Sequence, residues 1–408
     1  MIEKILQIQI NSFKNKKYSF CGFLSKVLTV YFLTFCSNPA HAKQSNSTSR
    51  IFTDKNTYQF SLQAPFAEMA QFKKDNGINF LANKNKKFPA ILSYKNSDQQ
   101  KISFNIQISL RGFTSLQTCD FPKLEIKFLD STAHTLFEDI KKIDLNTHCG
   151  EWKNKQNASP GDEFMYASLN KPFREVPIYR FMEKLGLPTL KVHPIYIEYI
   201  DTATQQRPES AQNEKYQAFF IEDKASFMKR LNLSEIKGVN DSFKQIDLDS
   251  KKTSPEQYQF LSVQTNASKI DLKQIAQIEL LQFLISNNDW YIKKSDNELR
   301  IPDLKEYLDE LWNINIFAKS SQEWVFLAHD YNLSYISAVE MEDKFSFTIP
   351  FKNKFLSMLD ETSKALVLNN FIKQKSLFLE ELQLLKEDPY YTKIIEHIEE
   401  KFIEIEKF

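Results

Sequence analysis

Two aspartates and one asparagine follow apolar segments in a pattern that suits the binding of a hard cation. Asp289 ends the run IELLQFLISNND, Asn297 comes eight residues later, and Asp330 follows the β-prone run WVFLA. Carboxylate and amide oxygens at the ends of buried elements are suitable ligands for Mg²⁺, which in turn can hold a phosphate-bearing substrate. The alternative is that each aspartate only caps a turn, since Asp and Asn are common turn residues.

The apolar patterns along the chain predict the elements that would position these residues. Alternating runs between residues 51 and 128 predict the short strands of an antiparallel sheet, and residues 131–170 are expected to form a polar connection. A helix is predicted at 173–185, and two further strands follow it before the chain becomes mainly helical near Glu222. We therefore expect an α+β protein with two lobes: a disordered lead-in at 43–50, a strand-rich domain at 51–222 and a helical domain at 223–408.

The N-terminal segment has the features of a secretory signal peptide. Several lysines precede the apolar run VLTVYFLTF, and the small-residue site Ala40-His41-Ala42 follows it. The run is shorter than the roughly 20 residues that a membrane-spanning helix needs. We predict cleavage near Ala42, a secreted or periplasmic mature protein, and no transmembrane span after the signal peptide is removed.

Charge and glycine content exclude several classes of partner and enzyme. The chain has 53 Lys and Arg against 52 Asp and Glu, and loss of residues 1–42 removes five Lys and one Glu, so the mature net charge is near −3. This balance gives no indication of a nucleic-acid partner. The glycine-rich phosphate-binding motifs G-x-x-x-x-G-K-[ST] and G-x-G-x-x-G are absent, as are H-E-x-x-H, G-x-S-x-G and C-x-x-C.

The mature chain would retain two cysteines. Cys21 and Cys36 lie in the signal peptide, whereas Cys119 and Cys149 remain, an even number in an oxidising compartment. A disulfide between them is predicted. The alternative, a thiol nucleophile, lacks a supporting triad, because the position of His148 next to Cys149 in sequence does not make a catalytic pair.

Five segments, in this order, resemble the spore-coat CotH kinase family, especially its secreted bacterial branch: LRGFTSLQTCDFPKLEIKF, FREVPIYRFMEKLGLPTLKVHPIYIEY, YQAFFIEDKASFMKRL, FLISNNDWYIKKSDNELR and WVFLAHDYN. The similarity spans about Ile102 to Ser334. It implies a bilobal, atypical protein-kinase-like fold with an antiparallel-sheet N-lobe and a mainly helical C-lobe. It also implies the binding of ATP with Mg²⁺ or Mn²⁺ and phosphorylation of a protein acceptor.

The resemblance assigns a role to individual residues near the nucleotide. Lys127 resembles the strand lysine that contacts the phosphates, and Arg111 and Gly112 match the loop that covers them. The glutamate that pairs with this lysine is either Glu175 or Glu183. Such groups fit phosphoryl transfer, whose loose transition state needs positioning and charge neutralisation.

The acidic residues also receive roles from the resemblance. Asp289 resembles the catalytic aspartate, while Asn297 and Asp330 resemble the metal ligands. The family pattern changes at Phe113, at Asp296 and at Asn332, where relatives commonly have Asn, His and Asp.

Three functions therefore stay open at the level of sequence. The first is an exported CotH-like kinase, and the second is a degenerate kinase-fold protein that binds or assembles partners in the cell envelope without catalysis. The third is a secreted structural protein without a ligand.

Overall fold

The computed structural model of the chain describes residues 49–77, 80–150, 160–236, 263–264, 266–287, 289–292, 294–295, 311–344, 347, 351 and 353–408. The predicted signal peptide, most of the predicted lead-in and Asn297 lie outside these ranges.

The first part of the described chain contains mainly strands. Its elements are α3 (Arg50–Thr53), β1 (Tyr58–Ala64), α4 (Phe66–Asn76), α5 (Phe80–Asn85), β2 (Phe88–Lys95), β3 (Lys101–Leu110), α6 (Phe113–Thr118), β4 (Leu124–Phe128), β5 (Lys142–Asn146), α7 (Pro160–Asn170), the 3₁₀ helix η2 (Pro172–Glu175), α8 (Val176–Lys184), β6 (Val192–Asp201) and β7 (Tyr216–Ile221).

The second part contains mainly helices. Its elements are α9 (Lys224–Leu231), β8 (Ser234–Glu235), η5 (Ala267–Lys269), α10 (Leu272–Leu284), β9 (Tyr291–Ile292), β10 (Leu311–Trp312), β11 (Ile314–Ala318), β12 (Trp324–Ala328), α11 (Tyr335–Ala338), η7 (Val339–Met341), η8 (Leu356–Met358), α12 (Glu361–Lys373), α13 (Lys375–Leu382), η9 (Gln383–Leu385) and α14 (Tyr391–Ile405).

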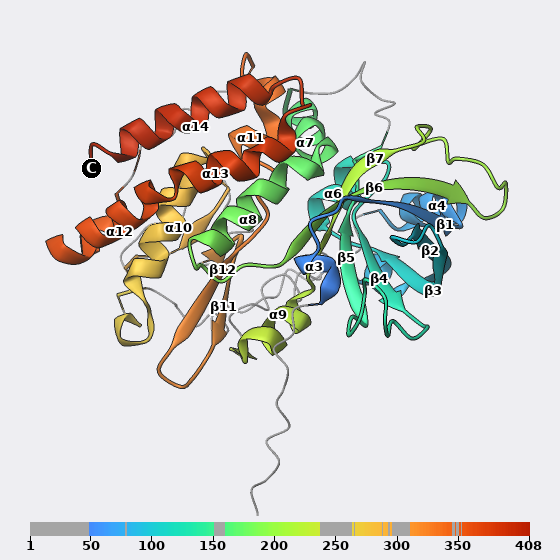
Figure 1. Cartoon of the computed structure of the whole chain (residues 1–408), viewed down its shortest axis with the longest axis horizontal. Helices are drawn as coiled ribbons and strands as arrows, with labels where there is room; N and C mark the ends of the chain where they lie inside the picture. Colours follow the sequence, from blue (N-terminus) through green and yellow to red (C-terminus); the bar gives the residue numbers. More distant parts are fainter. Residues whose placement is uncertain are drawn as a thin grey trace, which may run out of the picture. The chain divides into compact units, whose positions relative to one another are not determined.

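Within the described residues, β1 to β7 close into a barrel in the order β1-β2-β3-β4-β5-β7-β6 (Figure 1). All neighbouring strands are antiparallel except β1 and β6, which pair in parallel, with Tyr58 opposite Ile195. Because side chains alternate along a strand, every second residue points into the barrel. Leu92, Ile106 and Ile126 are among the fully buried residues of this barrel core.

The closed barrel corrects the predicted fold class. A bilobal kinase-like protein with an antiparallel-sheet N-lobe was expected, but the sheet is mixed and returns on itself. Two features cause the difference. The segment 131–170, predicted as a polar connection, contains β5, which joins β4 to β7, and the parallel pairing of β1 with β6 closes the ring. The structure is an α+β protein with a closed barrel and a group of helices, so the kinase-like fold prediction is wrong.

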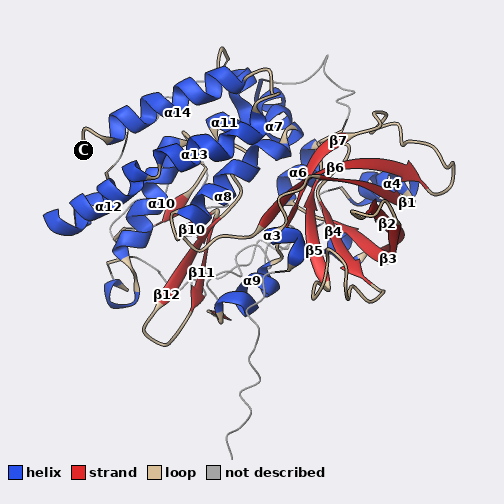
Figure 2. Cartoon of the chain, in the orientation of Figure 1, coloured by secondary structure: helices blue, strands red, loops and turns tan. Residues whose placement is uncertain are grey.

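The helices form a second apolar core beside the barrel (Figure 2). Helix α10 is buried on almost all sides, and its N-cap Asp271 accepts hydrogen bonds from the amides of Lys273 and Gln274. The rings of Phe181 on α8 and Phe378 on α13 stack with centroids 4.3 Å apart. Helix α8 precedes β6 in the chain, so the helical core is assembled from two separate parts of the sequence.

Strand β7 belongs to both cores. Its residues Ala218 and Phe220 point into the barrel, while Phe219 and Ile221 pack into the helical core. Because of this alternation, β7 contributes one face to the barrel core and the opposite face to the helical core. Residues of both parts can therefore meet at the junction between them.

Candidate functional site

A lysine from the barrel contacts an aspartate from the helical part. Lys123 directly precedes β4 and Asp330 follows β12. The distance from Lys123 Nζ to Asp330 Oδ1 is 3.5 Å, with side-chain exposures of 12% and 39%. The aspartate is thus paired with a cation on one side and open to solvent on another.

The backbone at Asp330 has an unusual conformation. Its φ angle is +64°, in the left-handed region, which is uncommon for a residue other than glycine. The Asp330 amide donates to the hydroxyl of Tyr179 at 3.2 Å, and the next amide, of Tyr331, donates to Glu175 Oε2 at 3.3 Å. Such strain persists only where neighbouring contacts hold it, and it is concentrated at functional sites.

Glu175 is a buried acid next to this pair. It lies in η2, is 1% exposed, and has its pKa raised to about 7. Burial is the main cause, and the Asp330 carboxylate adds to it, while the Lys123 ammonium acts in the opposite direction. Partial burial raises the pKa of Asp330, but the positive charges of Lys123 and Arg111 and the hydrogen bond from Lys123 outweigh it, so the pKa is lowered. Of the two acids, Glu175 holds a proton more readily.

Arg111 and Gly112 lie alongside Lys123. The Arg111 amide donates to the Lys123 carbonyl at 2.9 Å. The Arg111 guanidinium donates to Asn146 Oδ1 at 2.8 Å and lies 3.3 Å from Asp144 Oδ2, and these two partners are on the same face of β5. Gly112 has a φ of +81°, and a Cβ atom there would lie 2.6 Å from the Ser115 hydroxyl oxygen. The loop therefore requires glycine at this position.

Asp289 is joined to the Asp330 segment through Asn313. The side-chain amide of Asn313 donates to the Asp289 carbonyl at 2.7 Å and to Asp289 Oδ2 at 2.8 Å. The carbonyl of Asn313 accepts from the amide of His329 at 3.1 Å. Sequence reasoning missed Asn313, and its only signal is an Asn between two short β-prone segments, where a left-handed residue is common.

Lys127 does not belong to this cluster. It is exposed on β4, between the inward-pointing Ile126 and Phe128, and it lies opposite Lys142 of the neighbouring strand. Strand alternation directs its side chain to the outside of the barrel. The lysine that meets the acids is Lys123, four residues earlier, where the chain enters the strand.

The remaining predicted residues are placed as follows. Glu183 is half exposed, and its Oε1 accepts from Lys191 Nζ at 2.5 Å, so the glutamate at the cluster is Glu175. Asn297 is outside the described residues. Among those that are described, no group of three or more His, Cys, Asp and Glu side chains is arranged to hold a metal ion.

The predicted disulfide between Cys119 and Cys149 is confirmed, with Cα atoms 4.6 Å apart. Both cysteines are buried. The bond connects the end of α6 to the segment after β5, and the Phe121 amide donates to the Cys149 carbonyl at 3.0 Å. It thereby ties together the two segments that carry Gly112 and the partners of Arg111. A disulfide is compatible with an extracellular location.

Comparison of the sequence with protein-family models and with curated proteins found no match in either set. The resemblance to the CotH family therefore stays a prediction. Within the described part of the chain, no helix combines the length and apolar character needed to span a membrane.

Proposed function

We propose that the cluster around Lys123 and Asp330 binds a nucleoside triphosphate with a divalent cation and transfers its terminal phosphoryl group to a protein acceptor. The observation that carries this proposal is the Lys123–Asp330 pair, with Glu175 behind it and Asp289 joined to it through Asn313. This cluster brings positively charged and acidic side chains together where the barrel meets the helical part. Phosphoryl transfer depends on such positioning and charge neutralisation.

The charges of the cluster favour a metal–phosphate ligand over a simple anion. Lys123 and Arg111 attract phosphate oxygens, but the Asp330 carboxylate repels them. A divalent cation relieves this repulsion and neutralises charge on the phosphates. The 39% exposure of Asp330 leaves its carboxylate accessible for that purpose. Mg²⁺ or Mn²⁺ would be held by Asp330 together with phosphate and water oxygens, as Mg²⁺ commonly is.

Asp289 suits a different role. The two hydrogen bonds from Asn313 fix its backbone and its carboxylate. A positioned carboxylate can accept the proton of an attacking hydroxyl or orient that hydroxyl. We assign Asp289 to the acceptor and Asp330 to the cation.

Calorimetry with ATP and Mn²⁺ tests this division. Asp330→Ala should lose metal-dependent ATP binding, whereas Asp289→Ala should bind ATP like the parent and lose transfer of labelled phosphate to protein. Asp343→Ala, at an exposed position, is the matched control and should behave like the parent. The proposal fails if the parent binds no ATP with Mg²⁺ or Mn²⁺, or if both site variants bind ATP normally.

The second candidate function is a binding or assembly module of the cell envelope without catalysis. It is favoured by Asn332, which is 4% exposed and stands where the family resemblance leads one to expect a second acid. An amide in that position would weaken the hold on a cation. Metal-dependent ATP binding without labelled phosphate on any envelope protein would favour this candidate.

A further inference from the structure

One face of the segment formed by η2 and α8 holds the loop that carries Asp330. Glu175, Tyr179 and Met182 follow one another at intervals of four and three residues, which places their side chains on one face of a helix. The Asp330 amide donates to the Tyr179 hydroxyl at 3.2 Å, and the Tyr331 amide donates to Glu175 Oε2 at 3.3 Å. The Tyr331 hydroxyl donates to Met182 Sδ. This helical face therefore holds two successive residues of the loop.

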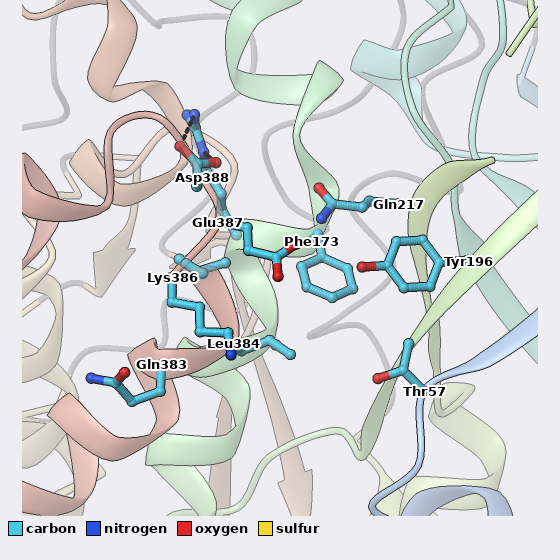
Figure 3. A pocket seen from close by; sticks show the side chains of 11 residues that line it. Thr57, Phe173, Tyr196, Gln217, Gln383, Leu384, Lys386, Glu387 and Asp388 are labelled. Carbon is cyan, nitrogen blue, oxygen red and sulfur yellow. Dashed lines mark hydrogen bonds and ion pairs between the residues drawn. The ribbon is translucent and has the colours of Figure 1, made fainter.

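The same segment is anchored in the helical part of the molecule. Arg174 in η2 is 1% exposed and donates through Nε and Nη2 to the Asp388 carboxylate at 2.8 and 3.0 Å (Figure 3). On α8, the ring of Phe181 stacks on Phe378 of α13. A side chain on a segment held in this way can fix the position of a group that it contacts.

The ring of Tyr179 is enclosed on two sides. Tyr179 is 3% exposed, and its ring meets the Tyr331 ring edge-on, with centroids 5.0 Å apart. The ring of Phe219, on barrel strand β7, lies 6.2 Å away. Because a ring packed between neighbours cannot turn freely, the hydroxyl is held where it meets the Asp330 amide.

The contact from Tyr179 is made to the residue with the unusual backbone. Asp330 has a φ of +64°, and a residue other than glycine keeps this conformation only where its surroundings hold it. The backbone angle sets the direction of the side chain, so the place of the Asp330 carboxylate depends on it. That carboxylate is the group assigned to the divalent cation, and Mg²⁺ in particular requires ligands close to an ideal octahedral arrangement.

We propose that Tyr179 is a positioning residue for Asp330: its hydroxyl oxygen holds the left-handed backbone, which keeps the carboxylate directed at the cation. This inference rests on the proposed function. It makes α8, whose Tyr179 acts only through Asp330, an element that sets the affinity of the site for Mg²⁺ or Mn²⁺.

Tyr179→Phe tests the inference, because it removes the oxygen and keeps the ring. In calorimetry with ATP at a series of Mn²⁺ concentrations, the Mn²⁺ concentration that gives half-maximal ATP binding should rise about fivefold, the loss expected for one hydrogen bond. At saturating Mn²⁺ the affinity for ATP should stay within about twofold of the parent, since Lys123 and Arg111 are unchanged. Hydrogen exchange of the Asp330 amide, followed by NMR without ligand, should become faster.

Tyr199→Phe is the matched control. Tyr199 is fully buried in the barrel core, and its hydroxyl has no hydrogen-bond partner among the described residues. This variant makes the same chemical change away from the site, so its Mn²⁺ requirement and its Asp330 exchange rate should equal those of the parent.

The possible failures can be told apart. If the parent binds no ATP with Mn²⁺ or Mg²⁺, the proposed function fails and this inference fails with it. If the parent binds ATP and Tyr179→Phe has the parent's Mn²⁺ requirement, only this inference is overturned. It is also overturned if the Asp330 amide exchanges at the same rate in both proteins, or if the variant loses as much ATP affinity at saturating Mn²⁺ as at low Mn²⁺.

Discussion

The buried carboxyl of Glu175 should make the protein less stable as the pH rises. Its pKa is raised from 4.5 to about 7, so the folded protein holds a proton that the unfolded chain has already released. The stabilising contribution is complete below about pH 4.5 and is lost as the pH rises through 7. A shift of this size corresponds to roughly 3 kcal/mol.

Glu175→Gln removes the ionisation but keeps an oxygen to accept from the Tyr331 amide. The free energy of unfolding of the variant, relative to the parent, should therefore grow by roughly 2–3 kcal/mol between about pH 5 and about pH 8. Urea denaturation at both pH values measures it. Taking the difference between the two proteins cancels the titration of the groups that lie far from Glu175.

Glu183→Gln is the control, because Glu183 lies eight residues later on the adjoining helix α8, is 50% exposed and makes an ion pair at the surface. Its effect on stability should stay below about 1 kcal/mol. A stability difference between Glu175→Gln and the parent that does not change with pH would refute the reasoning. A functional site can retain an acid that lowers the stability of the folded protein at neutral pH.

Three further predictions concern other parts of the structure. Lys123→Met should weaken ATP binding by about tenfold or more in calorimetry, whereas Lys127→Met should bind within about twofold of the parent; a loss only at Lys127 would contradict the placement of the two lysines. Cys149→Ser should lower the free energy of unfolding by about 2–5 kcal/mol in urea, and two free thiols in peptide maps of unreduced protein would disprove the bond. His193 is 1% exposed and its pKa is lowered to about 4, mainly by burial, so its stabilising contribution is present above about pH 6.5 and is lost as the pH falls to 4. His193→Phe should reduce this loss of unfolding free energy at acidic pH by up to about 3 kcal/mol. An acid-unfolding curve that is the same in the variant and the parent would show the reasoning to be mistaken.

Local patterns in the sequence predicted the strands β1 to β4, β6 and β7 and the helices α8, α9 and α10, but not the helices α4 and α7. The alternation in FPAILSY and ISFNIQISL corresponds to β2 and β3, and Asp223 before KASFMKRL caps α9. These elements are determined by residues that are close together in the sequence, so a single sequence is enough to predict them. Strand β5 was missed because KIDLN is short and follows a polar stretch, and its apolar residues Ile143 and Leu145 matter only once the barrel encloses them.

Contacts between segments far apart in the sequence could not be predicted from local patterns. The pairing of β1 with β6 joins segments far apart in sequence, and no local pattern specifies a parallel neighbour. The outward direction of Lys127 was different, since the alternation of Leu124, Ile126 and Phe128 already indicates it. Lys127 had been assigned to the phosphates by resemblance and not from this pattern. Asn313 connects two loops by its side chain and its carbonyl, which only a structure can reveal.

The parallel pair that closes the barrel also determines when the chain can fold. Tyr58 pairs with Ile195, so β1 has no partner on that side until β6 has been synthesised. At ribosomal rates this interval is on the order of ten seconds. Throughout it the apolar faces of β1 to β5 and two strand edges, those of β1 and β5, stay uncovered, which invites association with other chains. The nascent protein is therefore most prone to aggregate before residue 221 emerges, because β7 completes the ring, and a holding chaperone would be most useful in that interval.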